Sequence, residues 1–250
     1  MNNLRFLVIV SFINLIVSTP IVFGENIKHF IPHQLSQTDR HSALLLLGPA
    51  TSSRVLSSPY PLGGFQGIEV SLSRQNIPFT FLNSIGDKKN DQRDLDYSTL
   101  TIGKGLYYNI DLFLSFIPMI QYDSLSHFST QIRYQFWQSN NNFFRLSGIL
   151  HSSTSNIDNQ ISLQSYGYDF VGTTTIDRVS LFIGIGNSTN RGRFIGGKNG
   201  LTDNLETVTE VSIIPHQLIG IEWPIANFFW AAQVDRFNFP FYAFKFGYRM

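Results

Sequence analysis

From Phe65 to Met250, apolar and polar residues alternate with a period of two. In the first run, Ile68, Val70 and Leu72 alternate with a glutamate and two serines. About ten such runs follow one another, and most approach the roughly 9–11 residues that a tilted membrane strand needs. No apolar stretch here is long enough to cross a bilayer as a helix, so a membrane passage would have to use the strands of a closed sheet. The pattern predicts an all-β fold, a closed antiparallel up-and-down transmembrane β-barrel of about ten strands, with about eight or about twelve as alternatives.

Composition narrows the functional classes. Charged residues make up 14% of the chain and aromatic residues 14%, and the mean hydropathy is +0.00. A net charge of +1 gives no basic surface for nucleic acid, so no nucleic-acid partner is expected. The absence of cysteine excludes disulfides, zinc–thiolate sites and cysteine acylation. A soluble secreted β-protein shares this composition and stays open as an alternative.

The N-terminus has the pattern of a secretory signal. Arg5 precedes an apolar run from Phe6 to Val17, and small residues before Glu25 suit cleavage. The run is shorter than the roughly 20 residues of a spanning helix. We therefore predict a signal peptide at residues 1–24 and export of the remaining chain.

Residues 25–64 differ from the rest, because they are polar at first and then carry an apolar patch from Leu44 to Leu47. Two interpretations remain open: a periplasmic N-terminal extension, or a plug inside the barrel formed by residues 65–250. His29 and His33 lie four residues apart in this segment, but no third ligand accompanies them, so no metal site is predicted.

The connections between runs alternate in length. Joins near Tyr107, residues 139–142, residues 173–177 and residues 224–227 are short, whereas the polar stretches at 75–96, 152–160 and 187–204 are longer. Outer-membrane barrels have short periplasmic turns and longer external loops. This order predicts that both termini are periplasmic.

The last ten residues carry a resemblance. In Phe241–Met250 the aromatic residues alternate with other residues up to the end of the chain. The chain from Phe65 onward resembles the small outer-membrane β-barrel proteins of Gram-negative bacteria, at the level of architecture. The resemblance implies an outer-membrane location, with outer-membrane lipid and the barrel-assembly machinery as partners. It also implies an assembly signal at Phe244, Phe246, Tyr248 and Met250, although Met250 stands where a terminal phenylalanine is usual.

Strand parity divides the side chains between lipid and lumen. The charged side chains predicted to face the lumen are Glu69, Asp111, Arg133, Arg145, Asp169, Arg178, Glu222, Asp235, Lys245 and Arg249. Charges of both signs in a narrow barrel are expected to pair, which predicts a packed interior and no wide pore. The aromatic residues expected at the membrane interface are Tyr107, Tyr108, Trp223, Phe228 and Trp230. Trp137 has the wrong parity for lipid, and a parity switch between residues 161 and 168 predicts a bulge or a strand that extends above the membrane.

Two residue sets invite a catalytic interpretation. His151 and Ser153 share a strand face, as a base and a serine nucleophile would in a barrel of the lipid A deacylase kind. Asp94 and Asp96, with His216, are the alternative, of the omptin protease kind. Because polar loops produce such pairs by chance, catalysis is not expected, and neither is a cofactor. The sequence favours a structural, surface-interaction or narrow-passage role and does not identify a ligand.

Overall fold

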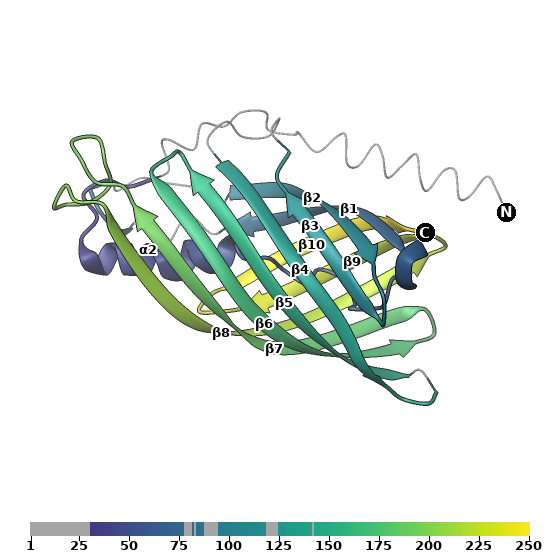
Figure 1. Cartoon of the computed structure of the whole chain (residues 1–250). Helices are drawn as coiled ribbons and strands as arrows, with labels where there is room; N and C mark the ends of the chain where they lie inside the picture. Colours follow the sequence, from purple (N-terminus) through teal and green to yellow (C-terminus); the bar gives the residue numbers. More distant parts are fainter. Residues whose placement is uncertain (1–30, 78–81, 83, 88–94, 119–124, 142) are drawn as a thin grey trace.

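In a computed structural model, the chain is described at residues 31–77, 82, 84–87, 95–118, 125–141 and 143–250, so the predicted signal peptide lies outside the described residues. Ten antiparallel strands follow one another and close into a barrel in which β1 pairs with both β2 and β10 (Figure 1). The strands are β1 (Ile68–Ile77), β2 (Leu95–Gly105), β3 (Ile110–Phe116), β4 (Leu125–Gln138), β5 (Phe144–Ile157), β6 (Ile161–Ile176), β7 (Val179–Phe194), β8 (Val208–Ile225), β9 (Phe228–Arg236) and β10 (Pro240–Arg249). The predicted fold class and the count of ten are confirmed. No helix in the described ranges is long and apolar enough to cross a membrane.

The barrel has two unlike ends. We call the end with the connections 106–109, 139–143, 177–178 and 226–227 the turn end, and it also holds Met250 and the short helix η2 (Gly64–Gln66). The opposite, loop end holds the connections 158–160, 195–207 and 237–239, together with Ile77 at the end of β1 and Leu125 at the start of β4. Two stretches predicted as loops are strand for much of their length, because β5 continues to Ile157 and β7 continues to Phe194.

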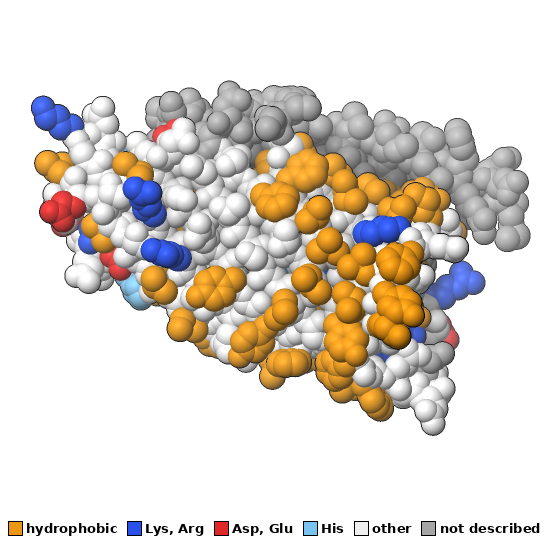
Figure 2. All heavy atoms as spheres, viewed as in Figure 1, with side chains coloured by type: hydrophobic (Ala, Val, Ile, Leu, Met, Phe, Trp, Pro, Cys, Tyr) orange, Lys and Arg blue, Asp and Glu red, His pale blue; other side chains and the backbone are white. Residues whose placement is uncertain are grey.

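Along those extended strands, the polarity of the outward and inward side chains reverses between the two ends of the barrel. Near the turn end, the outward side chains are apolar, as with Leu181, Ile183 and Ile185 on β7. Further along the same strand, Arg191 and Arg193 are outward and exposed, while Phe194 is buried inside. Figure 2 shows apolar side chains gathered on the part of the wall nearer the turn end, and charged side chains at the loop end. The wall is therefore built for an apolar surrounding over one part of its height and for water beyond it.

This reversal explains the parity switch in β6. Ile161 and Leu163 are buried inside the loop end, whereas Tyr166 and Tyr168 are exposed on the wall, and the pairing with β5 and β7 continues without a shift. Of the two predictions, the strand that extends beyond the apolar band is the one observed. The bulge lies in β4 instead, between Gln135 and Trp137, and it turns the Trp137 side chain outward.

A helix precedes the barrel and lies inside it. Helix α2 (Gln37–Ala50) begins at a capping box in which Ser36 and Asp39 bond to each other's backbone amides. Its second half is buried and packs within the loop end against β6, β7 and β8. Close approach depends on Gly48, where a Cβ would lie 2.7 Å from the Cβ of Asn190. Figure 1 shows α2 at the end of the barrel opposite the C-terminus.

The chain then runs through the lumen to the turn end, where β1 begins. Residues 37–62 lie inside the barrel, and we call them the plug. Ile31 lies at the loop end, since Leu35 pairs with Thr202 there and Ile31 is buried in the same core. The first described residue, Ile31, and Met250 are therefore at opposite ends of the barrel. The prediction that both termini are periplasmic concerns an N-terminus that lies outside the described residues.

Candidate functional site: a plugged lumen

The irregular part of the plug, residues 51–62, is bound to the wall on many sides. Near the helix, the Ser153 hydroxyl donates to the Thr51 carbonyl at 2.9 Å. Further down, the Leu56 amide donates to Gln233 at 2.8 Å. At the turn end, the Leu62 amide donates to Asp111 at 3.1 Å. These partners come from β5, β9 and β3, so the plug is attached across the full width of the lumen.

An ionic network closes the turn end. Glu69 accepts from Lys245 at 2.6 Å and from Arg249 at 2.8 Å. Arg249 also makes a two-pronged contact with Glu222, at 2.6 and 2.9 Å. Glu222 in turn accepts the backbone amide of Ser58 at 2.9 Å. The network joins β1, β8, β10 and the plug. Its charges are paired and hydrogen-bonded, which is what buried charges require to be stable.

Two lumen arginines bind the plug without a carboxylate. Arg133 donates to the Ser57 hydroxyl at 2.9 Å and to the Val55 carbonyl, and it lies 3.9 Å from the centre of the Phe113 ring. Arg145 donates to the Tyr60 hydroxyl at 2.7 Å and stacks over its ring. Guanidinium groups satisfy such sites with directed hydrogen bonds and aromatic faces.

A histidine–aspartate cluster lies in the lumen between β5, β6, β8 and β9. Both ring nitrogens of His216 lie 2.8 Å from carboxylate oxygens, Nδ1 from Asp169 and Nε2 from Asp235. His151 Nε2 lies 3.5 Å from the other oxygen of Asp169. The cluster needs glycine at residue 186, where a Cβ would lie 2.2 Å from an oxygen of Asp169. Among the described residues, no group is arranged to hold a metal ion.

The described residues of the two candidate catalytic sets are not brought together as either set would require. Ser153 donates to the plug and not to His151, and both side chains are buried in the lumen. Asp96 is exposed and paired with Arg74 at 2.6 Å, and Asp94 lies outside the described residues. His216, expected near that rim, is instead buried between Asp169 and Asp235, because its parity on β8 directs it inward.

The lumen charges predicted by parity can now be placed. Eight are buried inside the barrel, and Arg249 is half-buried among them; the eight are Glu69, Asp111, Arg133, Arg145, Asp169, Glu222, Asp235 and Lys245. The prediction that Arg178 faces the lumen is wrong. It is exposed beside Asp177 in the tight turn between β6 and β7, where strand parity no longer determines direction.

The predicted interface aromatic residues lie at the turn end. Tyr107, Tyr108 and Trp223 are exposed there, and Phe228 packs its ring 5.1 Å from that of Tyr248. Trp230 lies 5.7 Å from Phe246 on the neighbouring strand. On β10, Phe244 is exposed and Phe246 and Tyr248 are half-buried, while Lys245 enters the lumen; Met250, just after β10, is exposed. Their role as an assembly signal stays a prediction.

Sequence reasoning missed two features of this site. One is helix α2, although Ser36 and Asp39 have the spacing of a capping box and precede the Leu44–Leu47 patch. The other is Arg54, which enters the lumen from the plug and is fully buried there. No periodic pattern assigns a side for Arg54, since it lies in an irregular segment.

Neither a protein-family model nor a curated protein sequence matches the chain. Among solved structures, it is similar to the N-terminal β-barrel domain of Pseudomonas aeruginosa OprF, at 10% identity over 75% of this chain and 99% of that one, with a TM-score of 0.34. For the KdgM porin the identity is 10%, the coverage 73% and 98%, and the TM-score 0.37. For the Yersinia pestis outer membrane protein Ail in a phospholipid bilayer nanodisc, the identity is 15%, the coverage 73% and 99%, and the TM-score 0.34. The barrel itself is established by the pairing of this chain's own strands.

Proposed function

We propose that the chain is an outer-membrane barrel of a Gram-negative envelope that is sealed by its own plug and presents its loop end outside the cell. The observation that carries the proposal is the plug: residues 37–62 fill the lumen and bond to wall strands from one end to the other. A sealed barrel favours a structural or surface-interaction role over an open passage. The buried positions of His151 and Ser153 do not favour catalysis.

The exposed apolar wall supports the membrane location. Phe170, Ile183, Ile219 and Phe244 lie on four different strands, and each is about 57–63% exposed. Soluble proteins rarely expose contiguous apolar patches larger than a few hundred Å². If this apolar wall lies in lipid, the polar parts of β5–β8 near the loop end project from one side of the membrane. Outer-membrane barrels carry their larger loops on the external side, so we assign the loop end to that side.

The location and orientation are tested with epitope tags. One tag is inserted after Asn199 in the loop end, and its matched control after Asn141 in a turn. We expect the protein in the outer-membrane fraction, with the Asn199 tag labelled on intact cells and the Asn141 tag labelled only after permeabilisation. Recovery as a soluble periplasmic protein would contradict the membrane proposal, and the opposite labelling pattern would reverse the orientation.

The apolar band also makes a stability prediction. Ile183 lies in the middle of the band on β7, whereas Ile176 lies beside the turn between β6 and β7, and both are exposed. In a bilayer, Ile183→Arg is expected to cost about 2–4 kcal/mol and Ile176→Arg about 0–1 kcal/mol, because the penalty for arginine falls from the midplane to the interface. Urea unfolding in lipid vesicles measures both. Equal, small effects would place Ile183 outside the lipid.

A second candidate function, a gated narrow passage, is favoured by how the plug is held. Apart from a small apolar cluster around Val55, residues 51–62 contact the wall mainly through hydrogen bonds. Polar contacts of this kind exchange for water at small net free energy, so a displaced segment would leave a polar, hydrated lumen. The sealed barrel remains the leading proposal because those contacts are made in the structure.

A further inference from the structure

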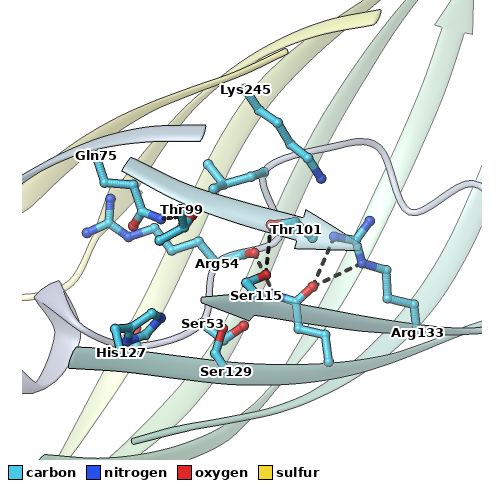
Figure 3. A pocket seen from close by; sticks show the side chains of 13 residues that line it. Ser53, Arg54, Gln75, Thr99, Thr101, Ser115, His127, Ser129, Arg133 and Lys245 are labelled. Atoms are coloured by element: carbon cyan, nitrogen blue, oxygen red, sulfur yellow. Dashed lines mark hydrogen bonds between the residues drawn. The ribbon is translucent and has the colours of Figure 1, made fainter. Parts of the chain in front are cut away.

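A small buried cavity of about 10 Å³ lies between the plug and the wall formed by β1–β4. Three cationic side chains line it, Arg54 from the plug, Arg133 from β4 and Lys245 from β10. Most of the remaining lining is hydroxyl and amide groups, including Thr101, Ser115 and Gln131, and no carboxylate lines it. Figure 3 shows Arg54 and Arg133 on opposite sides of this cluster, with the hydroxyl groups between them.

Arg54 is the unsatisfied member of the cavity lining. Its side chain is fully buried, and none of its three guanidinium nitrogens has a hydrogen-bond partner among the residues that the structure describes. Among the described residues it makes one ion pair, with Asp235 Oδ2 at 3.8 Å from Nε. That contact is longer than a hydrogen bond, and this Asp235 oxygen also has no hydrogen-bond partner in the described part of the chain. The other Asp235 oxygen already accepts from His216 and Gln233. A buried guanidinium in this state calls for a further acceptor, since buried charges are normally paired and hydrogen-bonded.

The two other cations keep their own partners and contribute charge to the cavity. Lys245 is paired with Glu69 at 2.6 Å. Arg133 donates to Ser57, Val55 and Gln131 and, in the described part of the chain, makes no ion pair within 4.0 Å. Together with Arg54 they make the cavity electropositive, so it favours an anion over a cation.

The charge balance of the lumen points the same way. Between α2 and the turn end, the described carboxylates are Glu69, Asp111, Asp169, Glu222 and Asp235, and they are matched in number by Arg54, Arg133, Arg145, Lys245 and Arg249. His216 adds to the positive side, because carboxylates accept and both of its ring nitrogens must donate to them. The described lumen thus carries an excess positive charge that one monovalent anion would neutralise.

We propose that this cavity binds one small monovalent anion of the chloride type, held by Arg54 and the hydroxyl-rich wall. A cavity of about 10 Å³ has room for roughly one water-sized occupant. A chloride ion is larger than a water molecule, so the side chains of the lining would move apart to admit it, whereas sulfate and phosphate would require a much larger displacement. The anion would complete the contact between the plug and β1–β4, because Arg54 belongs to the plug and the hydroxyl groups belong to the wall.

Halide-dependent stability tests the site in the full-length mature protein. Thermal unfolding is followed by loss of the compact, heat-modifiable band in sodium chloride, bromide, gluconate and sulfate at equal ionic strength. We expect a saturable rise in midpoint with chloride and bromide only, of about 5–10 °C at a hundred times the dissociation constant. Arg54→Met should abolish the rise, and Arg178→Met, an exposed arginine in a turn, should keep it.

A second measurement keeps the proposal testable if Arg54→Met does not fold. Crystals of the unaltered protein grown in bromide should show an anomalous peak in the cavity beside Arg54. Equal midpoints in all four salts, or a halide effect that persists in Arg54→Met, would overturn the proposal. A cavity that holds an ordered water and no bromide would overturn it as well.

Discussion

A chain that lacks residues 31–62 is expected to conduct ions across a planar bilayer, whereas the intact chain conducts none. The intact lumen is filled by α2 and by residues 51–62, which bond to the wall down to Asp111 at the turn end. A barrel of about eight strands is just filled by its own side chains, and ten strands enclose more space. The wall that remains is polar, with Glu222, Asp235 and Lys245 among its inward side chains, so water and ions would enter it.

Conductance steps from the two purified proteins are the measurement, with heat-modifiable mobility as evidence that each has folded. A synthetic peptide of residues 31–62, added to the shortened barrel, should reduce its conductance, and a peptide of scrambled sequence is the matched control. A folded shortened barrel without conductance would contradict the sealing role of the plug. Steady conductance from the intact chain would show that the plug does not seal.

If the shortened chain fails to fold, a milder variant separates folding from sealing. Replacing residues 52–58 with glycine and serine keeps α2 and its apolar contacts with β6, β7 and β8. It removes the side chains of Arg54, Val55 and Leu56. The flexible replacement also weakens the backbone contacts of residues 56 and 58 with Gln233 and Glu222, because ordering it costs more conformational entropy. This variant is also expected to conduct, since the remaining helix occupies the loop end only. If this variant folds and the bilayer shows no conductance, α2 alone is sufficient to block the lumen.

Much of the wall was predictable because alternation has a direct physical cause. In a strand, successive side chains point to opposite faces, so Glu69 and Lys245 follow inward from their apolar neighbours. The same rule failed at Arg178, because a two-residue turn ends the strand geometry on which parity depends. At residues 161–168 the same rule left a bulge and an extended strand as alternatives, and the extended strand is observed. Ile161 and Leu163 face inward for a reason other than lipid: they pack in the same core as α2 inside the loop end.

The plug was not predictable from alternation. Its lower half has no periodic pattern, and its contacts are long-range hydrogen bonds such as Ser58 to Glu222, which lie 164 residues apart. Sequence spacing identifies partners on one element and not across a lumen. For the same reason, spacing alone did not reveal the partner of Ser153: it shares the inward face with His151, but its hydroxyl donates to the Thr51 carbonyl of the plug.

The ionic network at the turn end carries the second large expected effect. Glu69→Gln should destabilise the barrel by about 3–5 kcal/mol, because it leaves the buried Lys245 ammonium without its carboxylate, while Arg249 retains Glu222. Asp96→Asn is the matched exposed control and should cost at most about 1 kcal/mol, since its pair with Arg74 is in water. Urea unfolding in lipid vesicles measures each variant. Adding Lys245→Met to Glu69→Gln should recover much of the loss, because a buried ion pair replaced as a unit leaves no unpaired charge. Additive losses in the double variant would show that Glu69 and Lys245 do not stabilise the barrel as a pair.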